Sequence, residues 1–260
     1  MRYFCFCQGD VLLTKEHTIP LDISQLGIKA WNYVTKLGDD VQVVRLDNPV
    51  VHESFVMVPL RQSFDLLSSD DYQLAGKCAE LLYFDSNSKF CGCCGAPMKW
   101  SSDISKKCTC CGKELWPQLQ TAVIVRITRP SGGASSAESN DNEEILLVHA
   151  RNFRGKHYGL VAGFVETGET LEQAVVREVR EEVGIEISDV RYYGSQPWPY
   201  PCGLMVGFTA RYAQGDVHLQ ASELTAGRWF NRNNLPEVPG PVSIAGQLIH
   251  DWLEDKRNMF

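Results

Sequence analysis

The chain has 260 residues, 44% of them hydrophobic and 22% charged, and its formal net charge at pH 7 is -7. This length allows one large domain or two to three small ones, and the hydrophobic content suffices for a packed core. No apolar run is long enough to span a bilayer, and the acidic balance argues against a general nucleic-acid coat protein. The start, MRYFCFCQGD, lacks the basic and apolar regions of a signal peptide, so we expect a cytoplasmic protein.

The first part of the chain, residues 1–86, carries no chemical motif and is expected to form a small α+β domain. The segments VQVVRL at 41–46 and SFVMVPL at 54–60 have the composition of strands. The segment DDYQLAGKCAELLYF at 70–84 has the pattern of a helix.

A zinc ribbon is predicted over residues 87–116. Six of the ten cysteines lie between positions 91 and 111, and reducing conditions make a disulfide framework unfavourable. Two C-x2-C pairs, each followed by glycine, supply the four thiolates of a closed tetrahedral Zn²⁺ site, which has a structural role. The predicted ligands are Cys91, Cys94, Cys108 and Cys111. Cys93 and Cys110 break the spacing and are interpreted as spectators, although a swap of register is conceivable. Buried small hydrophobes are the default interpretation of Cys5, Cys7, Cys78 and Cys202.

Residues 117–260 alternate between strand and helix patterns. Strands are predicted at 121–128, 144–150, 157–166, 185–196, 204–213 and 225–231, and an amphipathic helix at 242–256. The Ser-, Gly- and acid-rich segment 129–144 is interpreted as a flexible, solvated hairpin loop. Helices packed on a mixed sheet give an α/β/α sandwich, so the fold class is α/β with α+β character.

The most informative segment is GFVETGETLEQAVVREVREEVGI, residues 163–185. Thr170 is a suitable N-cap with Gln173 as its capping-box partner, and Gly184 suits the left-handed position after a helix. On that helix one stripe is apolar: Leu171, Val175, Val179 and Val183. A neighbouring face gathers Glu178, Glu181 and Glu182. Clustered carboxylates repel each other, and hard oxygen ligands suit Mg²⁺ or Mn²⁺.

This segment resembles the Nudix box at every defining position, which implies a hydrolase that cleaves a diphosphate linked to another moiety. A solvated charged face would explain the glutamates, but not the glycines, Glu169 and Arg177 at their positions as well. Glu169 and Arg177 are expected to form a structural ion pair.

A rigid aromatic strip follows the box in the segment SQPWPYP, residues 195–201. Alternating prolines exclude a helix and hold Trp198 and Tyr200 on an extended segment that suits stacking on a flat base. Taken alone, the strip is more typical of a loop that merely packs. Together with the four-cysteine ribbon and the box, it resembles the NADH pyrophosphatase family of Nudix hydrolases. That family cleaves NADH or NAD⁺ to nicotinamide mononucleotide and AMP, some members remove the NAD cap from RNA, and members are typically homodimers.

The resemblance implies roles for individual residues. Glu178, Glu182 and Glu223 match glutamates that bind the catalytic metal, and Ala162 matches a metal-binding main-chain carbonyl. Glu181 matches a third carboxylate, either another ligand or the base that activates water. The residues matched to substrate contacts are Arg61, Trp116, Phe164, Gln196, Pro197, Trp198, Pro199, Tyr200, Pro201, Cys202, Gly203 and Ala245. For Phe164 a core position is an equal alternative.

The sequence departs from the pattern of this family at two positions, and three alternative functions remain open. Tyr200 stands where the family has phenylalanine and keeps the stacking face, whereas Gly203 replaces a serine and removes a hydroxyl. The first alternative is a Nudix pyrophosphatase acting on ADP-ribose, a diadenosine polyphosphate or a damaged nucleotide. The second is a non-catalytic module that binds a nucleotide or RNA, and the third is a partner-binding protein built on the ribbon. The complete box and the retained glutamates argue against the last two.

Overall fold

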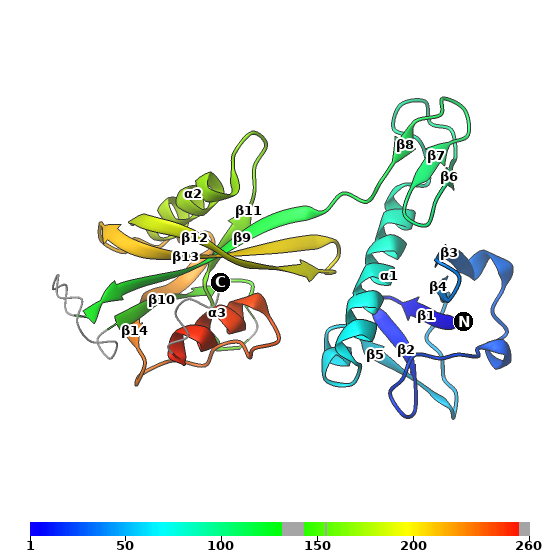
Figure 1. Cartoon of the computed structure of the whole chain (residues 1–260), viewed down its shortest axis with the longest axis horizontal. Helices are drawn as coiled ribbons and strands as arrows, with labels where there is room; N and C mark the ends of the chain where they lie inside the picture. The colour runs from blue at the N-terminus through cyan, green and yellow to red at the C-terminus, as the bar shows by residue number, and fades with distance from the viewer. Residues whose placement is uncertain (132–142, 154, 255–260) are drawn as a thin grey trace. The chain divides into compact units, whose positions relative to one another are not determined.

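The structure is a computed structural model that describes residues 1–131, 143–153 and 155–254. The chain forms two compact units (Figure 1). Met1–Leu119 and Pro197–Cys202 make the first, which we call the N-terminal unit. Gln120–Gln196 and Gly203–Phe260 make the second, which we call the Nudix unit.

The N-terminal unit contains a five-stranded sheet in the order β3-β4-β1-β2-β5. Strand β1 runs parallel to β4 and antiparallel to β2. The strands are β1 (Arg2–Cys7), β2 (Asp10–Thr14), β3 (Tyr33–Leu37), β4 (Val41–Arg45) and β5 (Phe55–Pro59). Short 3₁₀ turns lie at η1 (Ser24–Leu26), η2 (Ala30–Asn32) and η3 (Gln62–Asp65).

One long helix covers this sheet. Helix α1 (Ser69–Asn87) begins at Ser68, whose hydroxyl accepts from the amide of Asp71. Its buried face, including Ala75, Cys78 and Leu81, packs in one cluster with residues of the sheet. The helix and the strands β4 and β5 confirm the α+β pattern expected for this part of the chain.

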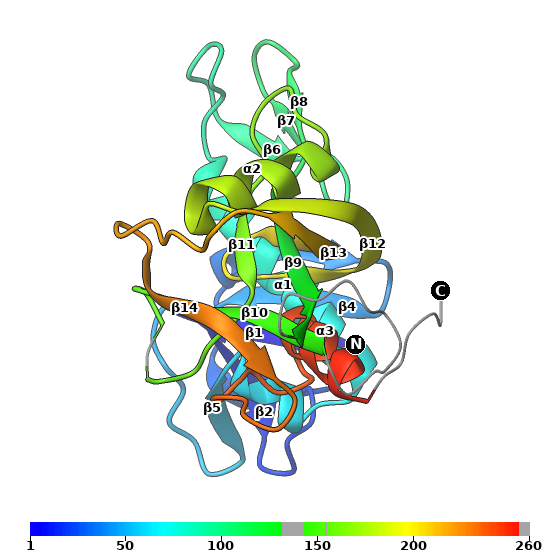
Figure 2. The ribbon, with the colours of Figure 1, turned by 90° about the vertical axis from the view of Figure 1, so that its left-hand side faces the viewer.

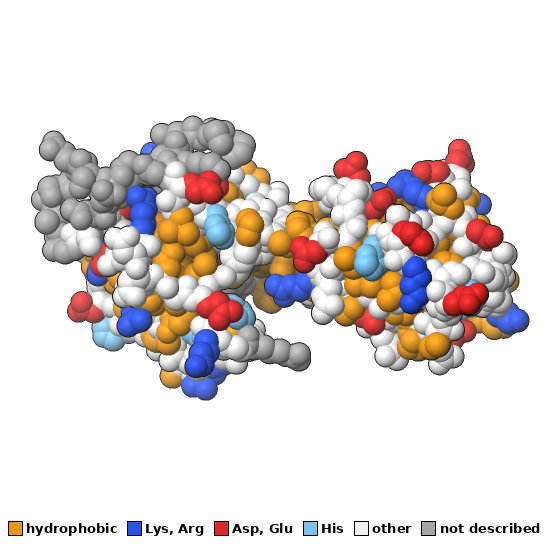
Figure 3. Space-filling view, turned by 90° about the horizontal axis from the view of Figure 1, so that it is seen from below, with side chains coloured by type: hydrophobic (Ala, Val, Ile, Leu, Met, Phe, Trp, Pro, Cys, Tyr) orange, Lys and Arg blue, Asp and Glu red, His pale blue; other side chains and the backbone are white. Residues whose placement is uncertain are grey.

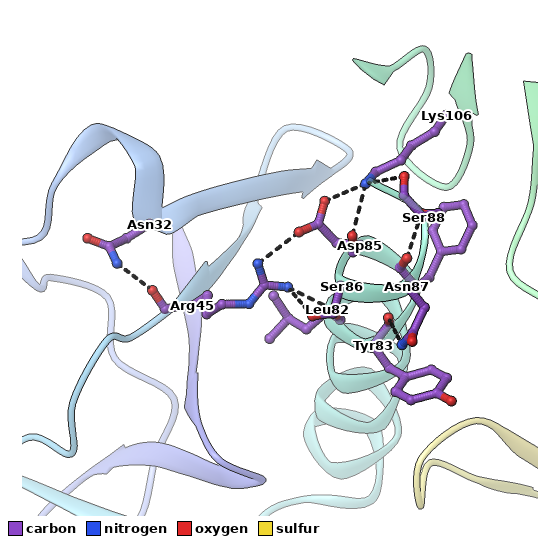
Figure 4. Close-up of polar contacts among 10 residues, drawn as sticks. Asn32, Arg45, Leu82, Tyr83, Asp85, Ser86, Asn87, Ser88 and Lys106 are labelled. Atoms are coloured by element: carbon purple, nitrogen blue, oxygen red, sulfur yellow. Dashed lines mark hydrogen bonds and ion pairs between the residues drawn. The ribbon is translucent and has the colours of Figure 1, made fainter. Parts of the chain in front are cut away.

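The three-stranded ribbon is β6 (Met98–Trp100), β7 (Lys106–Cys108) and β8 (Glu114–Leu115). Lys106 fixes it to α1, because its side chain is only 3% exposed and its Nζ lies 2.6 Å from Asp85 Oδ1 (Figure 4). Arg45 of the sheet approaches the other carboxylate oxygen at 2.8 Å. Although burial opposes it, the bonds from Lys106 and Arg45 lower the pKa of Asp85. A buried charge needs such pairing, so one carboxylate joins ribbon, helix and sheet.

The Nudix unit is built on a mixed sheet in the order β12-β13-β9-β10-β14, with β11 also paired to β9. Strand β13 runs parallel to β9, whereas β10 and β11 run antiparallel to it. The strands are β9 (Gln120–Pro130), β10 (Glu143–Ala150), β11 (Val161–Phe164), β12 (Glu186–Trp198), β13 (Gly203–Gln214) and β14 (Leu224–Asn231).

Helices α2 (Leu171–Val183) and α3 (Ile244–Leu253) lie on opposite faces of this sheet (Figure 2). Alternation along β9 explains both cores: Val123 and Val125 pack in the cluster of α2, and Ile124 between them packs in the cluster of α3. The α/β/α sandwich expected from the sequence is therefore confirmed.

Several boundaries differ from expectation, among them three in the Nudix unit. The strand predicted at 157–166 is confined to Val161–Phe164, because only Gly159 of the preceding residues forms a bridge, with Val148. The ends of the predicted loop 129–144 are strand residues, since Glu143 pairs with Pro130, while its middle, 132–142, lies outside the described residues. The final helix ends at Leu253, and positions 255 and 256 of its predicted range lie outside the description.

Acidic and basic side chains are interspersed on the face of the N-terminal unit that Figure 3 presents. The net negative charge of the chain is therefore not gathered into one area of that face. None of the helices in the described ranges combines the length and apolar character needed to cross a membrane.

Candidate active site

The Nudix helix α2 is defined by its two ends. Thr170 Oγ1 accepts from the amide of Gln173 at 3.2 Å, and the Gln173 side chain accepts from the amide of Thr170 at 2.8 Å. Gly184 follows the helix with φ of 73°, a left-handed conformation that glycine adopts without strain. Val175, Val179 and Val183 are fully buried, as the apolar stripe predicts. The local sequence thus fixes which face of the helix is left for the glutamates.

Glu182 is the most buried of these glutamates, with 5% of its surface exposed. Burial, followed by the charges of Glu178, Glu223 and Glu181, raises the pKa of Glu182 to about 8. Burial also raises the pKa of Glu178, against the opposing effect of Arg177. Glu223, far away in the sequence, thus acts electrostatically on Glu178 and Glu182.

Gly163 of β11 leaves room for one of these side chains. A Cβ at this position would lie 2.0 Å from the carboxyl carbon of Glu178, a separation that real contacts do not reach. The carboxylate therefore lies directly over the backbone of the strand that also carries Ala162. The glycine of the motif is explained by this close approach, and it brings the predicted main-chain ligand into the same neighbourhood as Glu178.

Arg177 organises the acidic face around it. Its Nε and Nη2 donate to the two carboxylate oxygens of Glu169 at 3.0 and 2.6 Å, which is the expected ion pair. Its Nη1 donates to Glu178 at 2.9 Å and to Glu181 at 3.1 Å, and Nη2 also donates to the carbonyl of Phe164 at 2.9 Å. The bonds from Arg177 and from the amide of Glu166 lower the pKa of Glu169. The guanidinium thus orients three carboxylates and compensates part of their charge.

The glutamates fit a hard divalent cation by their chemistry. Besides its burial, the charges of three further carboxylates raise the pKa of Glu182. An uncompensated buried acid is costly, and oxygen ligands around a cation remove that cost. Glu178, Glu182 and Glu223 are therefore the residues that could hold such an ion, with Glu181 at the exposed edge (53% exposed).

The four predicted cysteines form a much tighter group. The ligand atoms of Cys91, Cys94, Cys108 and Cys111 all lie within 4.8 Å of one another, the one such group in the described part of the chain. The sulfur of Cys91 lies 3.6 Å from that of Cys111, and the sulfur of Cys94 lies 3.5 Å from that of Cys108. This group could hold a metal ion.

The backbone around these cysteines favours the thiolate form. Amides of Cys110 and Cys111 both donate to Cys108 Sγ at 3.4 Å, and these bonds lower the pKa of Cys108 to about 6. Gly112 follows with φ of 74°, as the knuckle pattern requires. Cys93 and Cys110 are exposed and lie outside the group, and Cys93 accepts from Lys113 Nζ at 3.3 Å.

Residues 197–201 of the aromatic strip belong to the N-terminal unit, and two contacts within that unit hold them. Arg61 lies over the ring of Trp198, with Cζ 5.3 Å from its centroid. The hydroxyls of Tyr72 and Tyr200 are 2.8 Å apart. Burial and the bond with Tyr72 raise the pKa of Tyr200. Arg61, Trp198 and Tyr200 are thus brought together, and Tyr200 serves as an anchor of the strip.

Sequence reasoning missed the residues of α1 that receive the strip. Tyr72 bonds Tyr200, and one turn later Gly76 faces Pro199, whose Cγ would lie 3.1 Å from a Cβ at this position. Glycine inside a helix is unfavourable and marks close packing, so Gly76 was the available signal. No local pattern marks Tyr72.

The other predicted substrate residues occupy varied environments. Gln196 donates to the carbonyl of Val242 and accepts from the amide of Ile244, so it caps the start of α3 beside Ala245. Phe164 is 63% exposed, which excludes the core alternative, and Trp116 is 50% exposed. Cys202 is buried, Pro199 is buried, and Gly203 begins β13. Pro197 and Pro201 are exposed positions of the strip.

Part of the chain matches a known protein family. The family described as NUDIX domain matches residues 131–251. A NUDIX hydrolase structure from Nitrosomonas europaea is similar, with a TM-score of 0.48 and 24% identity, covering 65% of this chain and 92% of that one.

Two relatives match much more of the sequence. The chain is 35% identical over 241 residues to the NAD-capped RNA hydrolase NudC of Pseudomonas aeruginosa (strain LESB58), which covers 92% of this chain and 80% of that protein. It is 41% identical over 215 residues to the NAD-capped RNA hydrolase NudC of Klebsiella pneumoniae (strain 342), covering 82% and 77%. The extent of these matches, on a fold that carries the complete Nudix helix and the four-cysteine ribbon, shows that the chain belongs to the NudC family of Nudix hydrolases.

Proposed function

We propose that this protein is a metal-dependent pyrophosphatase that cleaves NADH or NAD⁺ to nicotinamide mononucleotide and AMP and also removes the NAD cap from RNA. The observation that carries the proposal is the buried carboxylate of Glu182, whose pKa is raised to about 8 by burial and by neighbouring glutamates. Such an arrangement is unfavourable for stability alone and suits cation-assisted hydrolysis. The names of the two relatives, NAD-capped RNA hydrolase, support the choice of substrate.

The proposed metal site consists of Glu178, Glu182 and Glu223 with the carbonyl of Ala162, and its ion is Mg²⁺ or Mn²⁺. Bound divalent ions neutralise the charge of a pyrophosphate and lower the pKa of a bound water. Arg177 holds Glu178 and Glu181 through one nitrogen. Glu181 is exposed, which suits it to take the proton of the attacking water as a general base. Water attacks phosphorus directly, so the proposal includes no covalent enzyme intermediate.

The aromatic strip is proposed to select the dinucleotide. Trp198 is half-buried and has Arg61 over its ring, so its orientation is set before a ligand binds. A fixed aromatic face loses little entropy when it stacks on a base. Phe164, Trp116, Gln196, Gly203 and Ala245 are proposed as further substrate contacts, as the resemblance implies.

The four cysteines are proposed to bind one structural Zn²⁺ per chain. Four protein ligands leave no open position for catalysis. We also propose a homodimer in the cytoplasm, as the resemblance implies. Light scattering on the purified protein tests the dimer, and metal analysis tests a zinc content of one ion per chain.

The decisive experiment for function is product analysis. Purified protein is incubated with NADH, NAD⁺, NAD-capped RNA or ADP-ribose, each with Mg²⁺ and with Mn²⁺, and products are identified by mass spectrometry. We expect nicotinamide mononucleotide from both free dinucleotides and a 5′-monophosphate RNA from the capped substrate. Turnover of ADP-ribose alone would favour the ADP-ribose alternative. Binding of NAD-capped RNA without any cleavage would favour the non-catalytic module.

A further inference from the structure

The turn that carries Glu223 is held at its start by the Nudix helix. The amide of Gln220 donates to the carbonyl of Glu182 at 2.8 Å, and the amide of His218 donates to that of Val183 at 2.9 Å. Within the turn, the amides of Glu223 and Leu224 both donate to the carbonyl of Gln220. These bonds link the turn to the main chain of a residue in the glutamate cluster.

At its other end the turn is held by one residue of the loop after β10. The amide of Arg151 donates to the carbonyl of Glu223 at 2.8 Å. Its side-chain Nε donates to the carbonyl of Ala221 at 2.7 Å. Arg151 thus binds the carbonyl of Glu223 itself and that of Ala221, two residues earlier in the same turn.

The chain next to this turn is irregular, so its direction depends on such contacts. Between β10 and β14, Ala150 pairs with Leu224 and His149 with Ala226, which leaves Thr225 as the extra residue of a bulge. A bulge changes the direction in which the neighbouring side chains point. His149 Nδ1 lies 2.8 Å from the hydroxyl of Thr225, which itself donates to the His149 carbonyl at 3.1 Å. The direction of the chain at Glu223 therefore depends on side-chain contacts as well as on the strand pairing.

We propose that Arg151 is a positioning residue that acts through its Nε–H bond to Ala221 to hold Glu223 in place for metal binding. The proposal rests on the metal role proposed above for Glu223. It assigns the effect to a hydrogen bond and not to the positive charge of the guanidinium. Groups that orient a metal ligand change metal affinity by about 10- to 100-fold when they are lost.

Three substitutions of similar length separate the bond from the charge. Arg151→Gln keeps an N–H donor after Cδ, where Nε stands, but removes the charge. Arg151→Lys keeps the charge but places a methylene at that point, and Arg151→Met keeps neither. The readout is the Mn²⁺ dissociation constant, measured by titration calorimetry without substrate and accompanied by thermal unfolding. Arg180→Met is the control, because Arg180 lies on the same unit and pairs with the exposed Glu186.

We expect the Lys and Met variants to bind Mn²⁺ about 10-fold more weakly, and Arg151→Gln to stay within about 2-fold of the unmodified protein. The unfolding temperatures of the variants and of the unmodified protein should be similar. The loss of kcat in the Lys and Met variants should be smaller at saturating Mn²⁺ than at limiting Mn²⁺. If Arg151→Lys binds Mn²⁺ normally and Arg151→Gln binds it weakly, the positive charge acts instead of the hydrogen bond and the inference is wrong. Normal binding by all three variants also overturns it.

A parallel variant distinguishes this inference from the proposed function. If Glu223→Gln binds Mn²⁺ normally, the metal role of Glu223 fails and the positioning role of Arg151 fails with it. If Glu223→Gln weakens binding while the Arg151 variants do not, only the positioning role fails. Lack of NADH cleavage with intact Mn²⁺ binding would contradict the substrate assignment and leave the role of Arg151 standing.

Discussion

The cysteine group of the ribbon and the glutamates proposed as metal ligands in the Nudix unit differ in how closely they are gathered. The four cysteines come from two turns of one short ribbon, and their sulfurs already lie within 4.8 Å of one another. The glutamates come from a helix and from a distant turn, and Arg177 bonds two of them. A closed group suits a structural ion, whereas a looser, partly exposed cluster leaves room for substrate and water.

The strongest test of this comparison removes one cysteine. Cys108→Ser should abolish bound zinc and destabilise the N-terminal unit by several kcal/mol, because structural zinc contributes directly to folding. Metal analysis and thermal unfolding measure both effects. Cys110→Ser is the matched control, since Cys110 is exposed and outside the group. A full complement of zinc in Cys108→Ser would show that another residue completes the site.

The corresponding change in the glutamate cluster should affect catalysis and leave the fold intact. Glu182→Gln removes the buried carboxylate, so we expect NADH turnover to fall by at least about 100-fold, corresponding to about 3 kcal/mol in the barrier. Far-ultraviolet circular dichroism should be unchanged. Glu172→Gln, in the exposed first turn of the same helix, should retain activity. Near-normal turnover in Glu182→Gln would refute its role as a metal ligand.

A smaller effect is expected from the residue that gives Glu178 its space. Gly163→Ala would place a methyl group 2.0 Å from the Glu178 carboxyl carbon, so this carboxylate must move. We expect about a 10-fold loss in Mn²⁺ affinity, as for other changes that misorient a ligand. Gly194→Ala is the control, because its Cβ would have no neighbour within 4 Å. Equal Mn²⁺ affinity in the two variants would mean that Glu178 adjusts without cost.

The smallest predicted effect concerns a buried carboxylate that lies outside both metal groups. Burial raises the pKa of Glu80 to about 7, and its Oε1 has no hydrogen-bond partner among the described residues. The folded state therefore holds this proton up to a higher pH than the unfolded state does. As pH rises above about 4.5 toward 7, ionisation of Glu80 should cost on the order of 1 kcal/mol of stability, allowing for partial solvent screening.

Glu80→Gln should remove this contribution. Chemical denaturation gives the free energy of unfolding of the unmodified protein and of the variant at pH 5 and at pH 8. The contribution of Glu80 is the difference between the changes of the two proteins over this range. The variant should lose less stability between these two pH values than the unmodified protein. An identical pH dependence in both proteins would show that Glu80 does not titrate in this range.

Much of the fold could be predicted because its signals are local. The caps of α2 at Thr170 and Gly184, and the alternation along β9, depend on residues within a few positions of each other. The same holds for the two cysteine pairs, whose spacing within each turn sets two ligands at once. Glu223 was placed beside the Nudix glutamates by resemblance, since one acid before a strand has no pattern of its own.

The sequence by itself determined most elements of the Nudix unit, the two sets of candidate metal-ligand residues and the face of the helix on which the Nudix glutamates stand. Only the tertiary structure decided that Tyr200 bonds Tyr72, that Lys106 is buried on Asp85, and that Arg151 binds the turn that carries Glu223. The physical reason is that helix caps and strand alternation are set by neighbours in the chain. Contacts between residues far apart in sequence depend on how strands pair and helices pack, and no local spacing encodes them.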